Sequence, residues 1–123
     1  MFIHPKWYER HVRHFNDAIA AFEMGDDKMA CYNAYVSVEA LARGILGYDP
    51  YGDFNDVKRL PALVKTIAGV GLPDDVSKCV ACLEKNAFGE SGEKCIKCAE
   101  VVANYLYIFL KAKEGAANIG RLY

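Results

Sequence analysis

The sequence predicts an all-α protein: an up-and-down bundle of four long helices plus one short helix, in a single domain over residues 1–123. Two observations lead to this fold class. Apolar residues recur at steps of three and four along most of the chain, which is the period of a helix with one buried face. Stretches of glycine, proline and short polar residues separate these segments, and we find no alternating strand pattern and no internal repeat.

Composition and charge narrow the class of protein. The chain is 53% hydrophobic and 25% charged, which is ordinary for a soluble globular domain. Its formal charge of -1 argues against a surface built for nucleic acid. The opening residues MFIHPKWYERH lack the apolar core of a signal peptide, and no apolar run reaches the ~18 residues of a membrane span. We therefore expect a cytoplasmic protein that does not bind membranes.

The first helix is expected from Pro5 to about Met24, because proline suits the first helical turn. Gly25 should end it with a left-handed backbone. Five apolar residues at steps of four and three predict its buried face: Tyr8, Val12, Phe15, Ile19 and Phe22.

The second helix is expected from about Lys28 to Leu46, with Asp26 or Asp27 as its cap. It is apolar over more than half of its circumference, so we expect it to be central in the bundle or to form half of a homodimer interface. Its predicted inner stripe consists of Cys31, Ala34, Val38, Leu41 and Ile45.

Three further helices follow a proline- and glycine-containing loop. A short helix is expected from about Asp56 to Ala68, and Pro61 moves its start toward Arg59 or Leu60. The third long helix opens at Pro73, and the last runs from Ser91 or Gly92 to about Lys113. The predicted inner residues of these two are Val76, Val80, Leu83 and Ala87, then Cys95, Cys98, Val102, Tyr105 and Phe109.

Two CxxC pairs, Cys79 with Cys82 and Cys95 with Cys98, are mirror images about a midpoint between Phe88 and Gly89. If the flanks are helices, the turn at this midpoint closes an antiparallel hairpin in which opposed cysteines lie at the same height. We therefore expect two disulfides, one joining the outer two cysteines and one joining the inner two.

Other chemistry remains open for these four cysteines. Cytosolic thiols are normally reduced, although hyperthermophile cytosol is an exception, and composition does not name the source organism. The same spacing could hold a tetrathiolate zinc ion if the cysteines are reduced, or they could be inert buried thiols or a thiol–disulfide exchange site. Cys31 stands alone on the second helix, and we expect it to be a core thiol.

A basic run on the first helix is a second candidate site. It contains Lys6, Arg10, His11, Arg13 and His14. Arg10 and His14 are four residues apart on one helix face, so together they could bind a phosphate. The acids Glu9 and Asp17 interrupt the run, and a solvated helix face is the favoured interpretation.

The helix order and several short sequence segments resemble the HEPN family (higher eukaryotes and prokaryotes nucleotide-binding). The segments are AAFEMG at 20–25, AYVSVEALA at 34–42, RLPALV at 59–64, CLE at 82–84 and AE at 99–100. Catalytic members carry an Arg-x4-6-His ribonuclease motif at the hairpin of the last two helices, and this hairpin holds neither arginine nor histidine.

The resemblance therefore implies a non-catalytic module that associates with protein or nucleotide, without a cofactor. It also implies a homodimer, a separately encoded nucleotidyltransferase partner and a toxin–antitoxin-type role. One alternative is an RNA-cleaving or nucleotide-acting enzyme that uses Arg10 and His14. Another is a metal- or redox-responsive bundle that uses the twin CxxC.

Overall fold

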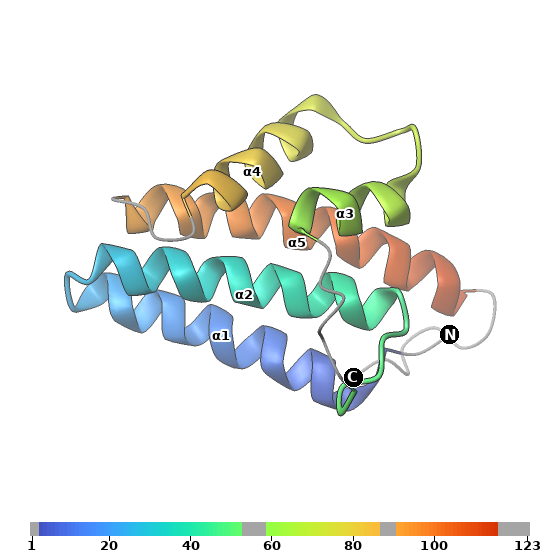
Figure 1. Ribbon diagram of the computed structural model, residues 1–123, viewed down its shortest axis with the longest axis horizontal. Coiled ribbons are helices and arrows are strands. Elements are labelled where there is room, and N and C mark those ends of the chain that lie inside the picture. Colours follow the sequence, from blue (N-terminus) through green and yellow to red (C-terminus); the bar gives the residue numbers. More distant parts are fainter. Residues whose placement is uncertain (1–2, 53–58, 87–90, 116–123) are drawn as a thin grey trace.

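The computed structural model describes residues 3–52, 59–86 and 91–115, and within these ranges it contains five helices and no strand (Figure 1). The helices are α1 (Pro5–Glu23), α2 (Asp27–Ile45), α3 (Leu60–Ala68), α4 (Asp74–Lys85) and α5 (Gly92–Gly115). The all-α prediction is confirmed for the described part of the chain. Over the same ranges, no helix has the length and apolar character that crossing a bilayer requires.

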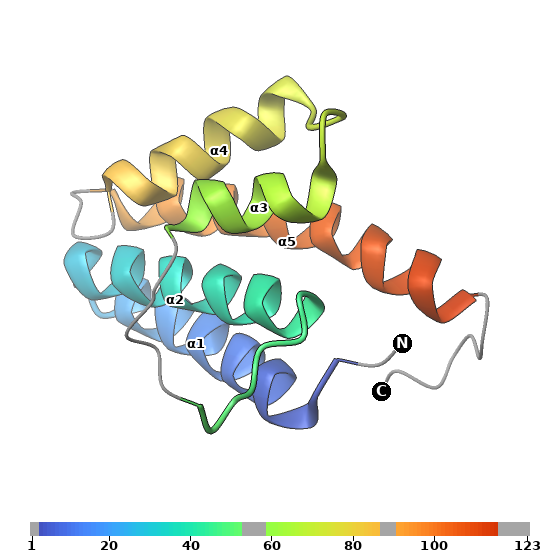
Figure 2. The same ribbon diagram turned by 45° about the vertical axis from the view of Figure 1, so that its right-hand side comes forward.

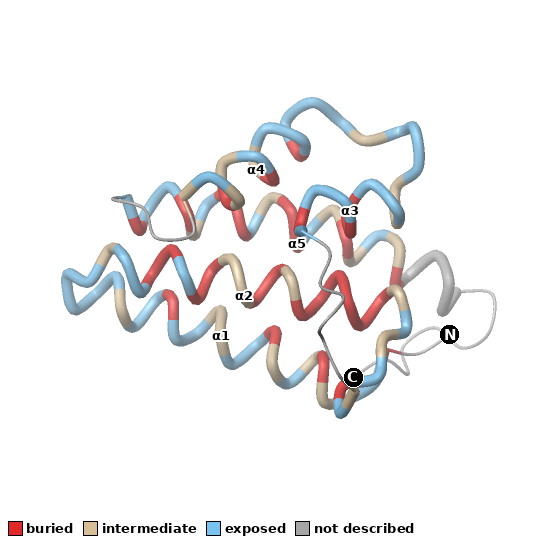
Figure 3. The backbone as a smooth tube through the Cα atoms, viewed as in Figure 1, coloured by how far each residue is buried: buried red, intermediate tan, exposed pale blue. Residues whose placement is uncertain are grey.

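α2 lies at the centre of the molecule and packs against each of the other four helices (Figures 1 and 2). Twelve of its 19 residues are buried, so buried positions follow almost its whole length in Figure 3. The central position explains why so much of its circumference is apolar. Its predicted inner stripe is confirmed, because all five residues are at most 2% exposed: Cys31, Ala34, Val38, Leu41 and Ile45.

Local signals position the helix ends. The side chain of His4 accepts from the Lys6 amide at 3.0 Å before α1, and Asp26 Oδ1 accepts from the Met29 amide at 3.1 Å at the start of α2. Gly25, between these two helices, has the predicted left-handed backbone with φ of 79°.

α3, α4 and α5 also begin close to where the sequence predicts. α3 starts at Leu60 because Pro61 is tolerated only in the first turn. Val76, Val80 and Leu83 are the buried residues of α4, as expected. Ala87 and the predicted hairpin midpoint at Phe88 and Gly89 lie outside the described residues.

The buried face of α1 differs from the prediction, since its buried residues are Trp7, His11 and Ala18. The periodicity counted only apolar side chains and so left out His11, which is buried because the fold bonds both of its ring nitrogens. Of the predicted stripe, Tyr8 and Phe15 are half-buried. The other three residues are more than a third exposed: Val12, Ile19 and Phe22.

A disulfide joins α2 to α5 near their N-terminal ends, between Cys31 and Cys95, whose Cα atoms lie 5.1 Å apart. The predicted bridge between Cys82 and Cys95 is therefore wrong, and so is the assignment of Cys31 as a core thiol. Cys79, Cys82 and Cys98 are all free thiols, so the predicted bridge between Cys79 and Cys98 is not formed either.

The close approach of α5 to α2 explains this pairing. The Gly92 amide donates to Asp27 Oδ1 at 3.0 Å, which places the starts of the two helices side by side. A Cβ atom on Gly92 would lie 2.9 Å from the Cβ of Ala30, closer than side chains tolerate. Cys95, one turn into α5, is thereby brought against Cys31 on α2 rather than against α4.

Gly92→Ala should lower the free energy of unfolding by about 1–3 kcal/mol, because the added methyl group overpacks the contact with Ala30. Gly71→Ala is the matched control, since nothing lies within 4 Å of its Cβ position and its backbone is not left-handed. Urea unfolding of both variants, with the disulfide intact, measures the difference. Equal stability of the two variants would contradict the close approach of α5 to α2.

Candidate functional site

α1 and α2 line a pocket of about 230 Å³ whose polar wall is rich in cationic side chains. Trp7, Arg10 and His14 come from α1, and Glu39 and Arg43 come from α2. The α1 residues are three and four positions apart, so they share a helix face. The structure thus places the two predicted phosphate-binding residues, Arg10 and His14, in the lining of one pocket.

The loop after α2 holds Trp7 and Arg10 in place. Trp7 Nε1 donates to the Tyr48 carbonyl at 2.7 Å, and Arg10 Nη2 donates to the Pro50 carbonyl at 2.8 Å. The Arg10 guanidinium also stacks on the indole, with Cζ 4.8 Å from the ring centroid. Gly44 leaves room for this arrangement, because a Cβ there would lie 2.8 Å from Trp7 Cβ. Arg10 is therefore held in one orientation beside the pocket.

Arg43 brings a second guanidinium, although the residue is only 4% exposed. Its Nη2 lies 3.4 Å from Glu39 Oε2, and its Cζ lies 5.2 Å from the centroid of the Tyr48 ring. Such partners are needed because a buried charge without them costs several kcal/mol. With Arg10 included, two guanidinium groups and one carboxylate line the pocket, an excess of positive charge that attracts an anion.

His14 is oriented by Asn33 of α2. His14 Nδ1 lies 2.9 Å from Asn33 Oδ1, while Asn33 Nδ2 donates to the Met29 carbonyl at 2.9 Å. Because an amide oxygen only accepts, Nδ1 of His14 carries the proton in this bond. Nε2 is then the ring nitrogen that takes no part in this bond.

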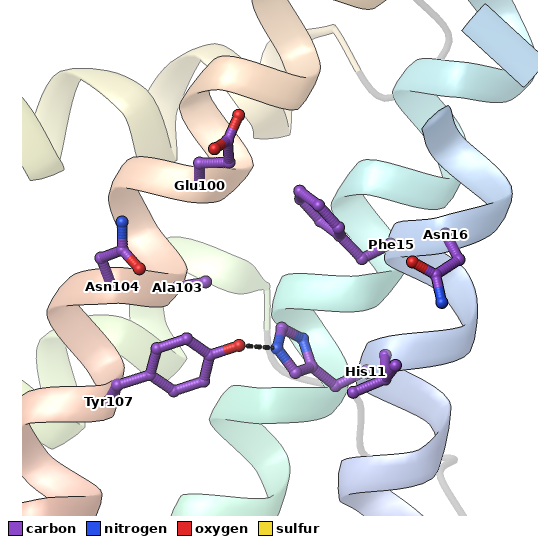
Figure 4. Close-up of a pocket in the computed structure, with 8 residues that line it drawn as sticks. His11, Phe15, Asn16, Glu100, Ala103, Asn104 and Tyr107 are labelled. Atoms are coloured by element: carbon purple, nitrogen blue, oxygen red, sulfur yellow. Dashed lines mark hydrogen bonds between the residues drawn. The ribbon is translucent and has the colours of Figure 1, made fainter. Parts of the chain in front are cut away.

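A second pocket, of about 210 Å³, lies between α1 and α5 (Figure 4). Its polar lining residues are His11 and Asn16 from α1 and Glu100, Asn104 and Tyr107 from α5. Figure 4 shows Tyr107 reaching across from α5, so that its hydroxyl meets the His11 imidazole.

His11 is 2% exposed and bonded at both ring nitrogens. Nδ1 lies 3.0 Å from the Ser37 carbonyl oxygen, which only accepts, so Nδ1 carries the proton. The Ser37 hydroxyl donates to the His11 carbonyl at 2.7 Å, and Nε2 accepts from the Tyr107 hydroxyl. Burial lowers the pKa of His11, although the Ser37 backbone bond opposes this, so the ring is neutral at pH 7.

This hydrogen-bond network shows that the basic run on α1 is not wholly a solvated helix face. His11 is removed from the solvated face, because it bonds both α2 and α5 in the interior. A neutral imidazole that accepts a hydrogen bond from a phenol can exchange a proton with that phenol. The bonds of His11 also have a structural role, because they satisfy the polar atoms of a buried side chain. Arg13 remains exposed on the surface of α1.

The disulfide also bears on the predicted zinc site. A tetrathiolate site would need Cys95, whose sulfur is bonded to Cys31. Among the residues that the structure describes, no group of three or more His, Cys, Asp or Glu side chains is arranged to hold a metal ion.

Three residues of these pockets are not among the site residues predicted from the sequence: Trp7, Arg43 and Tyr107. A signal for Trp7 was present, because it stands three and seven residues before Arg10 and His14 on the same helix face. Arg43 lies in the last turn of α2, where a basic side chain also serves the helix dipole and so gives no distinct signal. Tyr107 is 96 residues from His11, and nothing local marks the pair.

No protein-family model, no curated protein and no solved structure matches this chain. The resemblance to the HEPN family therefore stays a prediction from the residues alone. We infer the function from the pocket between α1 and α2 and from the chemistry of its side chains.

Stability should fall as the pH drops below about 6.5, the ordinary pKa of histidine. Because burial lowers the pKa of His11 in the folded protein, the unfolded chain takes up this proton first. The contribution is complete above that pH and is lost on acidification, at up to about 1.4 kcal/mol per pH unit, until the folded pKa is reached.

Urea unfolding between about pH 7.5 and pH 5 measures this loss. His11→Gln should flatten the pH dependence, whereas His4→Gln, at an exposed position, should retain it. An unchanged slope in His11→Gln would show that another group titrates.

Proposed function

We propose that the protein is a non-catalytic helical module that associates with a nucleotide by holding its phosphate in the pocket between α1 and α2. The observation that carries this proposal is the convergence of Arg10, His14 and Arg43 on one pocket. Guanidinium groups bind phosphate oxygens through charge-assisted hydrogen bonds, which are stronger than neutral ones. Arg10 is already oriented by Trp7 and Pro50, so it has less freedom to lose on binding.

The size of the pocket supports binding of the phosphate rather than of the whole nucleotide. Its volume of about 230 Å³ is below the roughly 300–1,000 Å³ of sites that enclose a drug-sized ligand. The sugar and base would therefore lie outside it. Tyr51 is 69% exposed and follows Pro50, which accepts from Arg10, and we propose that its ring stacks on the base.

The finer predictions on fold and assembly belong to the same proposal. They are an up-and-down bundle of HEPN type with four long helices, a homodimer, a cytoplasmic location, and a toxin–antitoxin-type role beside a separately encoded nucleotidyltransferase. The order of the helices, with the short α3 between α2 and α4, supports the first of these.

The alternative function is an RNA-cleaving or nucleotide-acting enzyme that uses Arg10 and His14. The shared pocket favours it, because a guanidinium could hold the phosphate while His14 Nε2 transfers a proton. Cleavage of RNA by the purified protein, lost in His14→Ala, would select this enzyme. No cleavage by the wild type would select the binding module.

Trp7 is the single tryptophan of the chain and lines the pocket, so its fluorescence reports directly on binding. We expect ATP to change this fluorescence and Arg10→Gln to raise the Kd for ATP about tenfold or more. The reason is that a hydrogen bond to a charged group contributes about 1.5–3 kcal/mol.

Arg13→Gln is the matched control, because Arg13 is exposed on the same helix and does not line the pocket. It removes the same charge from α1 and should leave the Kd unchanged. Calorimetry with ATP and with inorganic phosphate separates phosphate binding from contacts to the base. Equal weakening by both substitutions, or no binding of ATP at all, would rule out the proposed site.

A further inference from the structure

Three thiols gather where α4 packs against α5, and none of them lines either pocket beside α1. Cys79 and Cys82 are three residues apart on α4 and so share a helix face. Both thiols are neighbours of the Cys98 thiol on α5. Burial raises the pKa of the Cys98 thiol, and the two neighbouring thiols raise it further.

A groove of about 430 Å³ on the surface of the protein is lined by two of these thiols, Cys79 and Cys98. Cys79 is half-buried, whereas Cys98 is 8% exposed. Cys82 is not part of the lining, and Asn86 Nδ2 lies 3.5 Å from its sulfur. Both thiols face the same groove, and a small reactant there reaches Cys79 more easily because Cys79 is the more exposed of the two.

We propose that Cys79 and Cys98 form a reversible dithiol–disulfide couple that hydrogen peroxide oxidises. The Cys79 sulfur attacks one peroxide oxygen, the O–O bond breaks, and a sulfenic acid and one water form. The Cys98 sulfur then attacks the Cys79 sulfur and displaces the second water as the S–S bond forms. The two thiols lose two electrons and two protons, and the peroxide is reduced to two waters. A small dithiol reverses the change by exchange.

The disulfide between Cys31 and Cys95 determines which cysteines take part. Cys95 is the other member of the CxxC that contains Cys98, but its sulfur is already bonded to α2. Cys98 therefore has the α4 thiols as its neighbours, and of these only Cys79 shares the groove with it. Oxidation would join α4 to α5 covalently, across a contact that otherwise depends on side-chain packing. This inference uses none of the residues of the proposed phosphate site.

The test is to expose the folded protein to one equivalent of hydrogen peroxide, unfold it without reductant and count the alkylated cysteines by intact mass. The three free thiols of the untreated protein should fall to one, and peptide mapping should join Cys79 to Cys98. Brief treatment of the folded protein with dithiothreitol should restore three, since the buried Cys31–Cys95 bridge is shielded.

Three variants keep the proposal falsifiable. Cys82→Ser should lose both remaining thiols to the same disulfide, whereas Cys79→Ser should keep both at the same peroxide dose. In Cys98→Ser the reaction should stop at the sulfenic acid of Cys79, which dimedone traps. A bridge between Cys82 and Cys98 that forms equally fast, or oxidation to sulfinic acids without a disulfide, would overturn the proposal.

Discussion

The contact between the starts of α2 and α5 is the constraint on which the rest of the structure depends. The absence of a side chain at Gly92 lets α5 approach Ala30, and the Gly92 amide bonds Asp27. The disulfide from Cys31 to Cys95 then closes this contact across 64 residues of chain. A loop of that length loses enough unfolded-state entropy to contribute about 4 kcal/mol. Since α2 is the central helix, fixing α5 against it fixes the core that the other helices share.

The position of α1 follows from polar contacts inside this frame. His11 bonds Ser37 of α2 on one side and Tyr107 of α5 on the other, so it sets how α1 is rotated about its axis. The same rotation turns Arg10 and His14 toward α2, where Arg43 meets them. The anion pocket is thus a consequence of how α1 is anchored. It also explains why several apolar residues of α1 remain at the surface.

The disulfide also divides the five cysteines into a bonded pair and three free thiols. It removes Cys95 from the twin CxxC and leaves three thiols together between α4 and α5. The bridge is buried, whereas the groove beside Cys79 is open at the surface. One pair of cysteines therefore stabilises the fold, while the remaining cluster is placed to react.

Helix ends could be predicted from the sequence because prolines, glycines and caps act within a few residues, as at Pro5, Gly25 and Pro61. The shared face of Arg10 and His14 could also be predicted, from their spacing of four. The partners of Cys95 and His11 could not, because they lie 64 and 96 residues away. The mirror symmetry of the two CxxC pairs predicts disulfides between α4 and α5. The packing of α5 against α2 instead brings Cys95 to Cys31.

The measurement that tests this account most directly is the number and position of free thiols in protein purified without reductant. The protein is unfolded in a chelating denaturant, alkylated, weighed intact and then digested for peptide mapping. We expect three modified cysteines, at Cys79, Cys82 and Cys98, and one linked pair of peptides containing Cys31 and Cys95. Five modified cysteines, or a single one at Cys31, would contradict it.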